Sequence, residues 1–192
     1  MRYALLLAFL TCCRTSALRA EEPPPTLPWE ADFRATDFDP AWRRVVDRGG
    51  SVALKDGGLV VKAEAGARAH VERPLDRDLV TISAKVGRWA SIYLVWDADH
   101  WCGVGKVSPT PFGRFYSALA DGGAVDEADH RGLDFGALQH VRVQLGGNYI
   151  RFLSSMDGEE WTELRAVERP KDFAGAPRLI AAGQSYAAEE KP

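Results

Sequence analysis

The chain has 192 residues, enough for one domain of ordinary size, so its length argues against a multidomain protein. Its formal net charge is -3 and it has no long run of like charges, which argues against a nucleic-acid-binding protein. A hydrophobic fraction of 46% is sufficient for a folded core and excludes general disorder.

Residues 1–20 have the layout of a secretory signal peptide. Arg2 supplies a positive start, Ala4 to Leu10 form an apolar run, and the small residues Ala17 and Ala20 offer cleavage sites. The apolar run is too short to span a bilayer. The alternative is a buried first helix. We therefore expect a secreted or periplasmic protein that has no membrane span.

The cysteine count depends on this cleavage. Removal of residues 1–20 takes away Cys12, Cys13 and three positive charges, so the net charge changes from -3 to -6 and Cys102 remains alone. A domain without an internal disulfide must be stable through its core. A lipid anchor at Cys12 or Cys13 is an alternative, disfavoured because the residue before such a cysteine should be small.

A proline-rich, acidic stretch follows the predicted cleavage site. It covers residues 21–28 and reads Glu21-Glu22-Pro23-Pro24-Pro25-Thr26-Leu27-Pro28, which favours an extended spacer. No second linker of this kind appears. We therefore expect one domain over residues 29–186 and a polar tail over residues 187–192.

Short alternating apolar segments make up the rest of the chain, separated by Gly, Asp and Asn residues that tolerate the positive φ of tight β-turns. From Gln139 to Leu145, aliphatic residues alternate with polar ones, as in a half-buried antiparallel strand. Gly146-Gly147-Asn148 joins this segment to the next and predicts a hairpin. The predicted strands are Ser51 to Lys55, Gly58 to Ala63, Ala67 to Glu72, Leu79 to Val86, Ser91 to Trp96, Trp101 to Val107, Arg114 to Leu119, Gln139 to Leu145, Asn148 to Ser154 and Arg178 to Ala182.

No segment keeps a helical period for more than two turns. Many short strands with almost no helix predict an all-β fold, an antiparallel sandwich of two sheets.

The segment Ser155-Met156-Asp157-Gly158-Glu159-Glu160-Trp161 resembles the S-x-D-G-x-x-W segment of concanavalin A-like lectin/glucanase domains, which include laminin G-like jelly rolls. In those domains the tryptophan packs back on the sheet. Asp37-Phe38-Asp39-Pro40-Ala41-Trp42 is similar to the opening of the same superfamily, and residues 91–97 with 101–106 match its central pair of strands. The resemblance implies a jelly roll, an architecture that hosts lectins, glycosidases and adhesion modules. The usual closing strand, Phe-Asp-x-Phe-x-Val, is not found, so it is absent or replaced, or the chain is a fragment.

Aromatic and polar residues gather around the two predicted central strands. Alternation places Tyr93 and Trp96 on opposite faces of their strand. Rings on the concave sheet face of a jelly roll would stack on a pyranose while polar neighbours bind its hydroxyls. The alternative is that these rings belong to the core. The expected ligand-binding residues are Tyr93, Trp96, Asp97, His100, Trp101, Lys106 and Arg151.

No catalytic residue is assigned. The resemblance implies that a retaining jelly-roll glucanase carries Glu-x-Asp-x-x-Glu on one strand, which sets its carboxylates on one face. The nearest string, Glu127-Ala128-Asp129-His130-Arg131-Gly132, lacks the last Glu and reads as a polar loop. Asp97-Ala98-Asp99-His100 offers two carboxylates and a histidine, yet it reads most simply as a β-turn. Cys102 is expected to be a buried small residue.

We expect no cofactor. A structural Ca²⁺ is the alternative, held with the help of Asp37 and Asp39, while Asp97, Asp99 and His100 offer further oxygen and nitrogen ligands. No compact acidic loop supplies the six to eight oxygens that Ca²⁺ prefers, and the histidines show no zinc spacing.

These features together predict an exported binding module that recognises a glycan through an aromatic-lined concave sheet face. A sugar-acting hydrolase, of the glycosidase or keto-disaccharide hydrolase type, is one alternative. A protein-binding adhesion module is another. The hydrolase requires two carboxylates within about 10 Å of each other on the concave face, and the lack of such a pair would exclude it.

Overall fold

The structure is a computed structural model that describes residues 31, 33–34, 37–47, 49–63, 69–75, 81–87, 89–107, 114–131 and 139–183. The predicted signal peptide, the proline-rich spacer and the polar tail lie outside these residues. Within the described ranges, no helix is long and apolar enough to cross a membrane.

The described residues form thirteen strands and no helix, and all the strand pairings are antiparallel. This confirms the predicted all-β, antiparallel two-sheet jelly roll. The strands are β1 (Arg43–Val46), β2 (Ser51–Lys55), β3 (Gly58–Lys62), β4 (Ala69–Pro74), β5 (Thr81–Val86), β6 (Ala90–Val95), β7 (Trp101–Val107), β8 (Arg114–Asp121), β9 (Ala124–Arg131), β10 (Gln139–Gly146), β11 (Tyr149–Ser155), β12 (Thr162–Glu168) and β13 (Arg178–Gly183).

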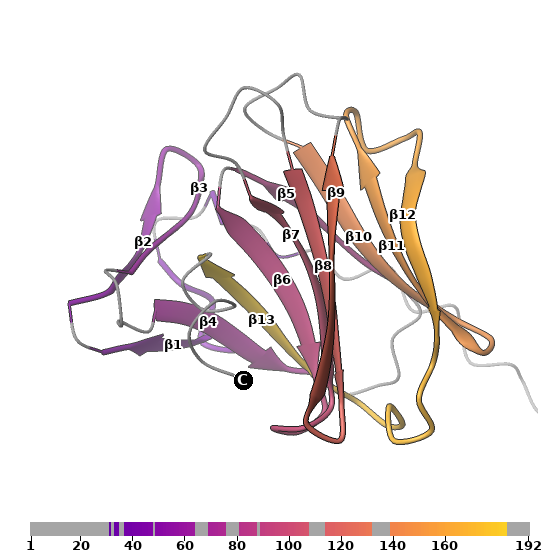
Figure 1. Cartoon of the computed structure of the whole chain (residues 1–192). Coiled ribbons are helices and arrows are strands. Elements are labelled where there is room, and N and C mark those ends of the chain that lie inside the picture. The colour runs from indigo at the N-terminus through magenta and orange to yellow at the C-terminus, as the bar shows by residue number, and fades with distance from the viewer. Residues whose placement is uncertain are drawn as a thin grey trace, which may run out of the picture. The chain divides into compact units, whose positions relative to one another are not determined.

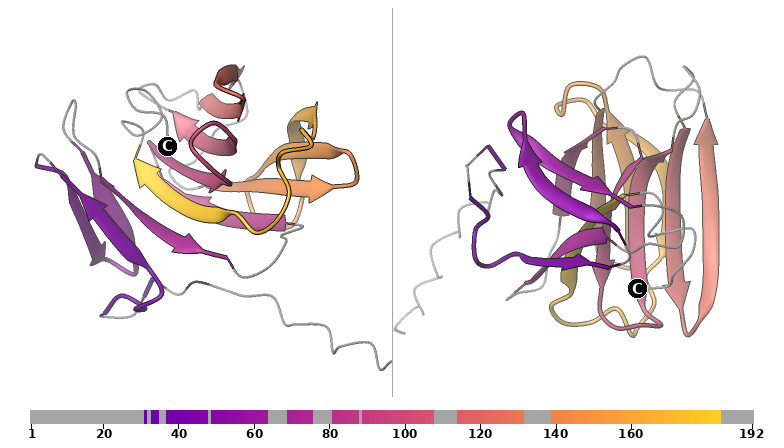
Figure 2. Two further views of the ribbon diagram at one scale, coloured as in Figure 1. Left: turned by 90° about the horizontal axis from the view of Figure 1, so that it is seen from below. Right: turned by 90° about the vertical axis from the view of Figure 1, so that its left-hand side faces the viewer.

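Two sheets form the layers of the sandwich (Figure 1). The larger has the order β1-β4-β13-β6-β7-β8-β9 and the smaller has the order β12-β11-β10-β5. A separate β2–β3 hairpin contacts β4 (Figure 2). The last described strand, β13, pairs with β4 on one side and with β6 on the other, so it joins these two strands within the larger sheet.

Three strands, β1, β9 and β12, were not predicted, and each lies at the edge of its sheet. Edge strands have one unpaired side, and charged residues there protect them against pairing with other chains. The β9 sequence AVDEADHR is mostly exposed and charged. The prediction of a polar loop around Glu127 was therefore wrong, because hydrophobic alternation is the signal that an exposed edge strand lacks.

Side chains of the larger sheet alternate between two faces. Arg165 of β12 donates to Asp126 of β9, and this ion pair joins the smaller sheet to the larger one. Asp126 shares its face with Leu119, its cross-strand partner. We call this the inner face. A cluster of buried residues that contains no member of the smaller sheet covers the opposite side, which we call the outer face; it comprises Tyr93, Val95, Trp101, Ala118, Ala120, Ile180 and Ala182.

The S-x-D-G-x-x-W segment folds as the resemblance implies. Asp157 accepts hydrogen bonds from the Ser155 hydroxyl and from two backbone N–H groups of the turn. Trp161 donates its indole N–H to the Gly158 carbonyl oxygen at 3.0 Å. The Arg142 guanidinium of β10 lies 3.7 Å from the centroid of the Trp161 ring, so this tryptophan packs back on the smaller sheet.

Candidate functional site

The outer face of the larger sheet contains one row of side chains that crosses six strands. Strand register places Glu72, Ile180, Tyr93, Gly103, Ala118 and Glu127 opposite one another on β4, β13, β6, β7, β8 and β9. Cross-strand partners share a face, so the row has a carboxylate at each end and an aromatic ring between them.

Glycine in β7 allows the Tyr93 ring to lie across the sheet. A Cβ atom at Gly103 would come within 2.2 Å of Tyr93 Cδ1. The neighbouring outer-face position, Gly105, lies equally close to Ser91. Because neither glycine has a side chain, the ring of Tyr93 lies against the backbone of β7.

Trp101 lies beside Tyr93 on the outer face. The two rings are 5.8 Å apart between centroids, with an edge-to-face angle of 73°. Tyr93 is 1% exposed and Trp101 is 3% exposed. Among the described residues, the Trp101 indole N–H has no hydrogen-bond partner. An unsatisfied buried donor costs about 1–3 kcal/mol.

Polar residues of β8 and β9 form one margin of this aromatic cluster. The Tyr116 hydroxyl donates to Glu127 Oε1 at 2.7 Å, and Arg114 forms an ion pair with Asp129. Burial, followed by the hydrogen bond to Glu127, raises the pKa of Tyr116, so its phenol remains a donor at neutral pH. These side chains lie on the outer face, as Gly105, Tyr116 and Asp129 are partners in register.

Glu72 of β4 forms the opposite margin. Its carboxylate is buried and forms ion pairs with Arg43 of β1 and Arg178 of β13, the second at 2.8 Å. His70 Nε2 lies 3.8 Å from the same carboxylate. The outer face is therefore apolar in the centre and ionic along both margins.

The predicted binding residues do not all share this face. Tyr93 and Trp101 lie together on it. Lys106 points to the inner face by alternation from Gly103 and is 1% exposed. Arg151 belongs to β11 of the other sheet, where it is exposed and pairs with Glu163. The expectation that Lys106 and Arg151 line the same surface as Tyr93 was therefore wrong.

The turn between β6 and β7 contains Trp96, Asp97 and His100. The strand predicted to end at Trp96 ends at Val95, so Trp96 belongs to the turn. Trp96 stacks on Phe173 with ring centroids 4.5 Å apart and donates its indole N–H to Gly175. Asp97 accepts hydrogen bonds from two backbone N–H groups of this turn, and one of its oxygens lies 2.8 Å from His100 Nδ1. The turn predicted for Asp97 to His100 is thus confirmed.

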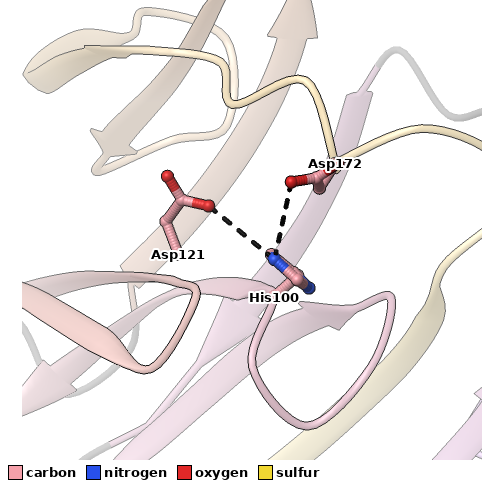
Figure 3. Close-up of side chains that lie close together, drawn as sticks. All are labelled: His100, Asp121 and Asp172. Carbon is pink, nitrogen blue, oxygen red and sulfur yellow. Dashed lines mark ion pairs between the residues drawn. The ribbon is translucent and has the colours of Figure 1, made fainter.

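The His100 ring also faces two further carboxylates (Figure 3). Its Nε2 lies 3.8 Å from Asp121 at the end of β8 and 3.9 Å from Asp172 in the segment between β12 and β13. The hydrogen bond with Asp97 is the main cause that raises the pKa of His100, and it lowers the pKa of Asp97 in turn.

Other candidates from the sequence have structural roles. Cys102 is buried, and burial raises the pKa of its thiol, so it is not an activated nucleophile. Asp39 accepts a backbone hydrogen bond from Ala41 and pairs with Arg73 at 3.1 Å. Neither Asp37 nor Asp39 belongs to a group of potential metal ligands among the described residues.

Sequence reasoning did not select Tyr116, Glu127 and Asp129 as binding residues. The available signal was the alternation in Glu127-Ala128-Asp129, which places both carboxylates on one face once the segment is a strand.

No protein-family model matches the chain, and neither does any curated protein. Solved structures do match. A mutant of the GH43 protein BlXynB from Bacillus licheniformis has a TM-score of 0.63 at 14% identity, over 87% of this chain and 38% of that one. This chain therefore spans well under half of that protein.

Two smaller proteins match over most of their own length. The carbohydrate binding module CBM66 from Bacillus subtilis has a TM-score of 0.52 at 12% identity, over 75% of this chain and 88% of that one. A laminarinase from Flavobacterium sp. UMI-01 has a TM-score of 0.54 at 12% identity, over 80% and 85%. At these identities the likeness shows a shared β-sandwich fold.

Proposed function

We propose that this chain is an exported module that binds a glycan on the outer face of its larger sheet. The observation that carries the proposal is the placement of the Tyr116–Glu127 and Arg114–Asp129 pairs beside the Tyr93–Trp101 cluster. Similar structures include a carbohydrate binding module and a laminarinase, which supports the same class of ligand.

The chemistry of a sugar fits these groups. A pyranose has an apolar face of C–H groups and a rim of hydroxyls, each of which both donates and accepts hydrogen bonds. The half-buried Tyr116 ring offers the apolar contact, and the exposed carboxylates of Glu127 and Asp129 offer acceptors. The guanidinium of Arg114 offers donors.

A glycan array followed by calorimetry on the strongest ligand tests this proposal. We expect Glu127→Gln and Tyr116→Phe each to weaken glycan binding by at least tenfold. The first removes a charged acceptor for a sugar hydroxyl, and the second removes the hydroxyl that donates to Glu127. Tyr149→Phe on the smaller sheet is the matched control for Tyr116→Phe, since Tyr149 is 52% exposed there. A folded protein that binds no glycan would instead favour a protein-binding adhesion module.

A hydrolase is the second candidate, favoured by one observation. Glu127 and Asp129 lie two residues apart on one strand face, as do the first two carboxylates of Glu-x-Asp-x-x-Glu. Gly132 stands where the signature has its second glutamate. A retaining mechanism needs two carboxyl groups about 5–5.5 Å apart, and the string lacks the glutamate that the signature supplies as the second of its two glutamates. An assay for reducing ends released from β-glucans tests this candidate. Activity in the parent that is lost in Glu127→Gln would support the hydrolase over the binding module.

Export is part of the proposal. Expression of the full chain in a bacterial host, with N-terminal sequencing of the exported protein, is expected to give a start after Ala17 or Ala20. An exported protein that begins at Met1 would contradict the predicted cleavage.

A further inference from the structure

A second group of side chains lies where three segments of the sandwich meet (Figure 3). His100 comes from the turn between β6 and β7, Asp121 from the end of β8, and Asp172 from the segment that connects β12 to β13. One ligand atom from each residue lies within 4.8 Å of the others. Segments of both sheets therefore converge on the imidazole.

The imidazole is held in one orientation. Asp97 lies 2.8 Å from Nδ1, so this nitrogen carries a proton that the carboxylate accepts, and the lone pair of neutral His100 is on Nε2. The Phe173 ring packs edge-on against the imidazole at 6.2 Å between centroids. A carboxylate on one ring nitrogen with the other nitrogen turned to a set of donors is the usual arrangement around a metal-bound histidine.

The distances fit a cation between the three donors. At 3.8 and 3.9 Å, the separations from Nε2 to Asp121 and Asp172 are too long for hydrogen bonds. Two ligands of a tetrahedral Zn²⁺ at about 2.0–2.1 Å from the metal are themselves about 3.4 Å apart, so each of these two separations would shorten by about half an ångström around the ion.

The charge of the group also calls for a cation. Asp121 and Asp172 approach each other, and within the described ranges neither forms an ion pair with Lys or Arg. A positive charge between them, either the protonated His100 ring or a bound metal ion, offsets their repulsion.

We propose that His100, Asp121 and Asp172 bind a divalent transition metal ion, with Zn²⁺ as the best-fitting cation and Asp97 as the positioning residue of His100. One imidazole with two carboxylates suits Zn²⁺, whereas Ca²⁺ takes oxygen ligands and more of them. The ion would tie the β12–β13 connection to the turns of the larger sheet. This site differs from the Ca²⁺ site expected at Asp37 and Asp39, and it does not depend on the proposed glycan binding.

Zinc titration of the metal-free full chain, followed by calorimetry and by thermal unfolding, tests the site. We expect one Zn²⁺ per chain and a rise in Tm with zinc that Ca²⁺ at the same concentration does not give. His100→Gln, Asp121→Asn and Asp172→Asn should each weaken zinc binding by at least tenfold. Asp99→Asn in the same turn and His140→Gln on the smaller sheet are the matched controls, and both should bind zinc as the parent does.

Three results would overturn the proposal: no zinc binding by the parent, equal binding by the three variants, or stabilisation by Ca²⁺ in place of Zn²⁺. The aspartate variants keep the test valid if His100→Gln fails to fold. Their side chains are 50% and 74% exposed, so the substitutions remove little packing.

Discussion

Tyr93 of β6 lies directly against Gly103 of β7, its partner across the strand pair. Added to this glycine, a Cβ atom would meet not only the Tyr93 ring but also the Ile92 carbonyl oxygen at 2.9 Å. The backbone cannot move away as easily as a flexible side chain. The pair therefore requires glycine at 103 for steric reasons.

We expect Gly103→Ala to lower the free energy of unfolding by about 1–3 kcal/mol, the usual cost of overpacking a core. Urea denaturation measures this change. Gly146→Ala is the control, because a Cβ at Gly146 meets nothing within 4 Å. Equal stability of the two variants would contradict the close contact between Gly103 and the Tyr93 ring.

The buried Glu72 carboxylate predicts a non-additive pair of substitutions. The side chain of Arg43 is exposed and that of Arg178 is partly exposed, and loss of either one leaves Glu72 with the other guanidinium, so each single loss should cost less than about 1 kcal/mol. Loss of both leaves a buried carboxylate without either guanidinium, at a cost of about 3–5 kcal/mol. A double-mutant cycle with Arg43→Ala and Arg178→Ala measures the coupling, and strictly additive effects would contradict the arrangement.

The Asp157 turn predicts a pH dependence. Backbone N–H groups of Glu159 and Glu160, with the Ser155 hydroxyl, lower the pKa of Asp157 to about 2. A depressed pKa in the folded state stabilises the fold above the unfolded value of about 3.9, and this contribution is lost as the pH falls through about 2.

The Tm difference between the parent and Asp157→Asn should therefore be largest near pH 6, should shrink as the pH falls towards 2 and should be lost below pH 2. Glu160→Gln in the same turn controls for the loss of one negative charge. A Tm difference that does not change with pH would show that the charge of Asp157 is not what stabilises the turn.

Phe173 predicts a large loss of stability at the β12–β13 connection. Its ring is fully buried and stacks on Trp96, so Phe173→Ala should cost about 3–5 kcal/mol. Met156→Ala is the control for an apolar side chain that is 61% exposed. Chemical denaturation of both variants measures the difference, and a small loss at Phe173 would mean that the segment carries little of the core.

The sequence predicted strands wherever one face is buried. The segment from Gln139 to Leu145 alternates because one side of β10 packs in the sandwich, and its hairpin with β11 formed as expected. The edge strands β1, β9 and β12 were not predicted, because exposed and charged residues replace the alternation of apolar and polar residues there.

The candidate site was only partly predictable for a related reason. Alternation correctly separated Tyr93 from Trp96 within one strand, but it says nothing about which strands become neighbours. Arg151 and Lys106 were grouped with Tyr93 by their place in the sequence, and the topology then sent them to another sheet and to the inner face. Asp121 and Asp172 came together with His100 only through the fold.

The place of β13 determines when the larger sheet can form. This strand lies between β4 and β6, and the ion pair between Arg178 of β13 and Glu72 of β4 joins residues that are 106 positions apart in the chain. A ribosome must therefore release nearly all of the described chain before β4 and β6 find their shared neighbour, and such long-range pairing is slow. Cleavage before Arg178 would leave β4 and β6 with unpaired edges that are open to aggregation.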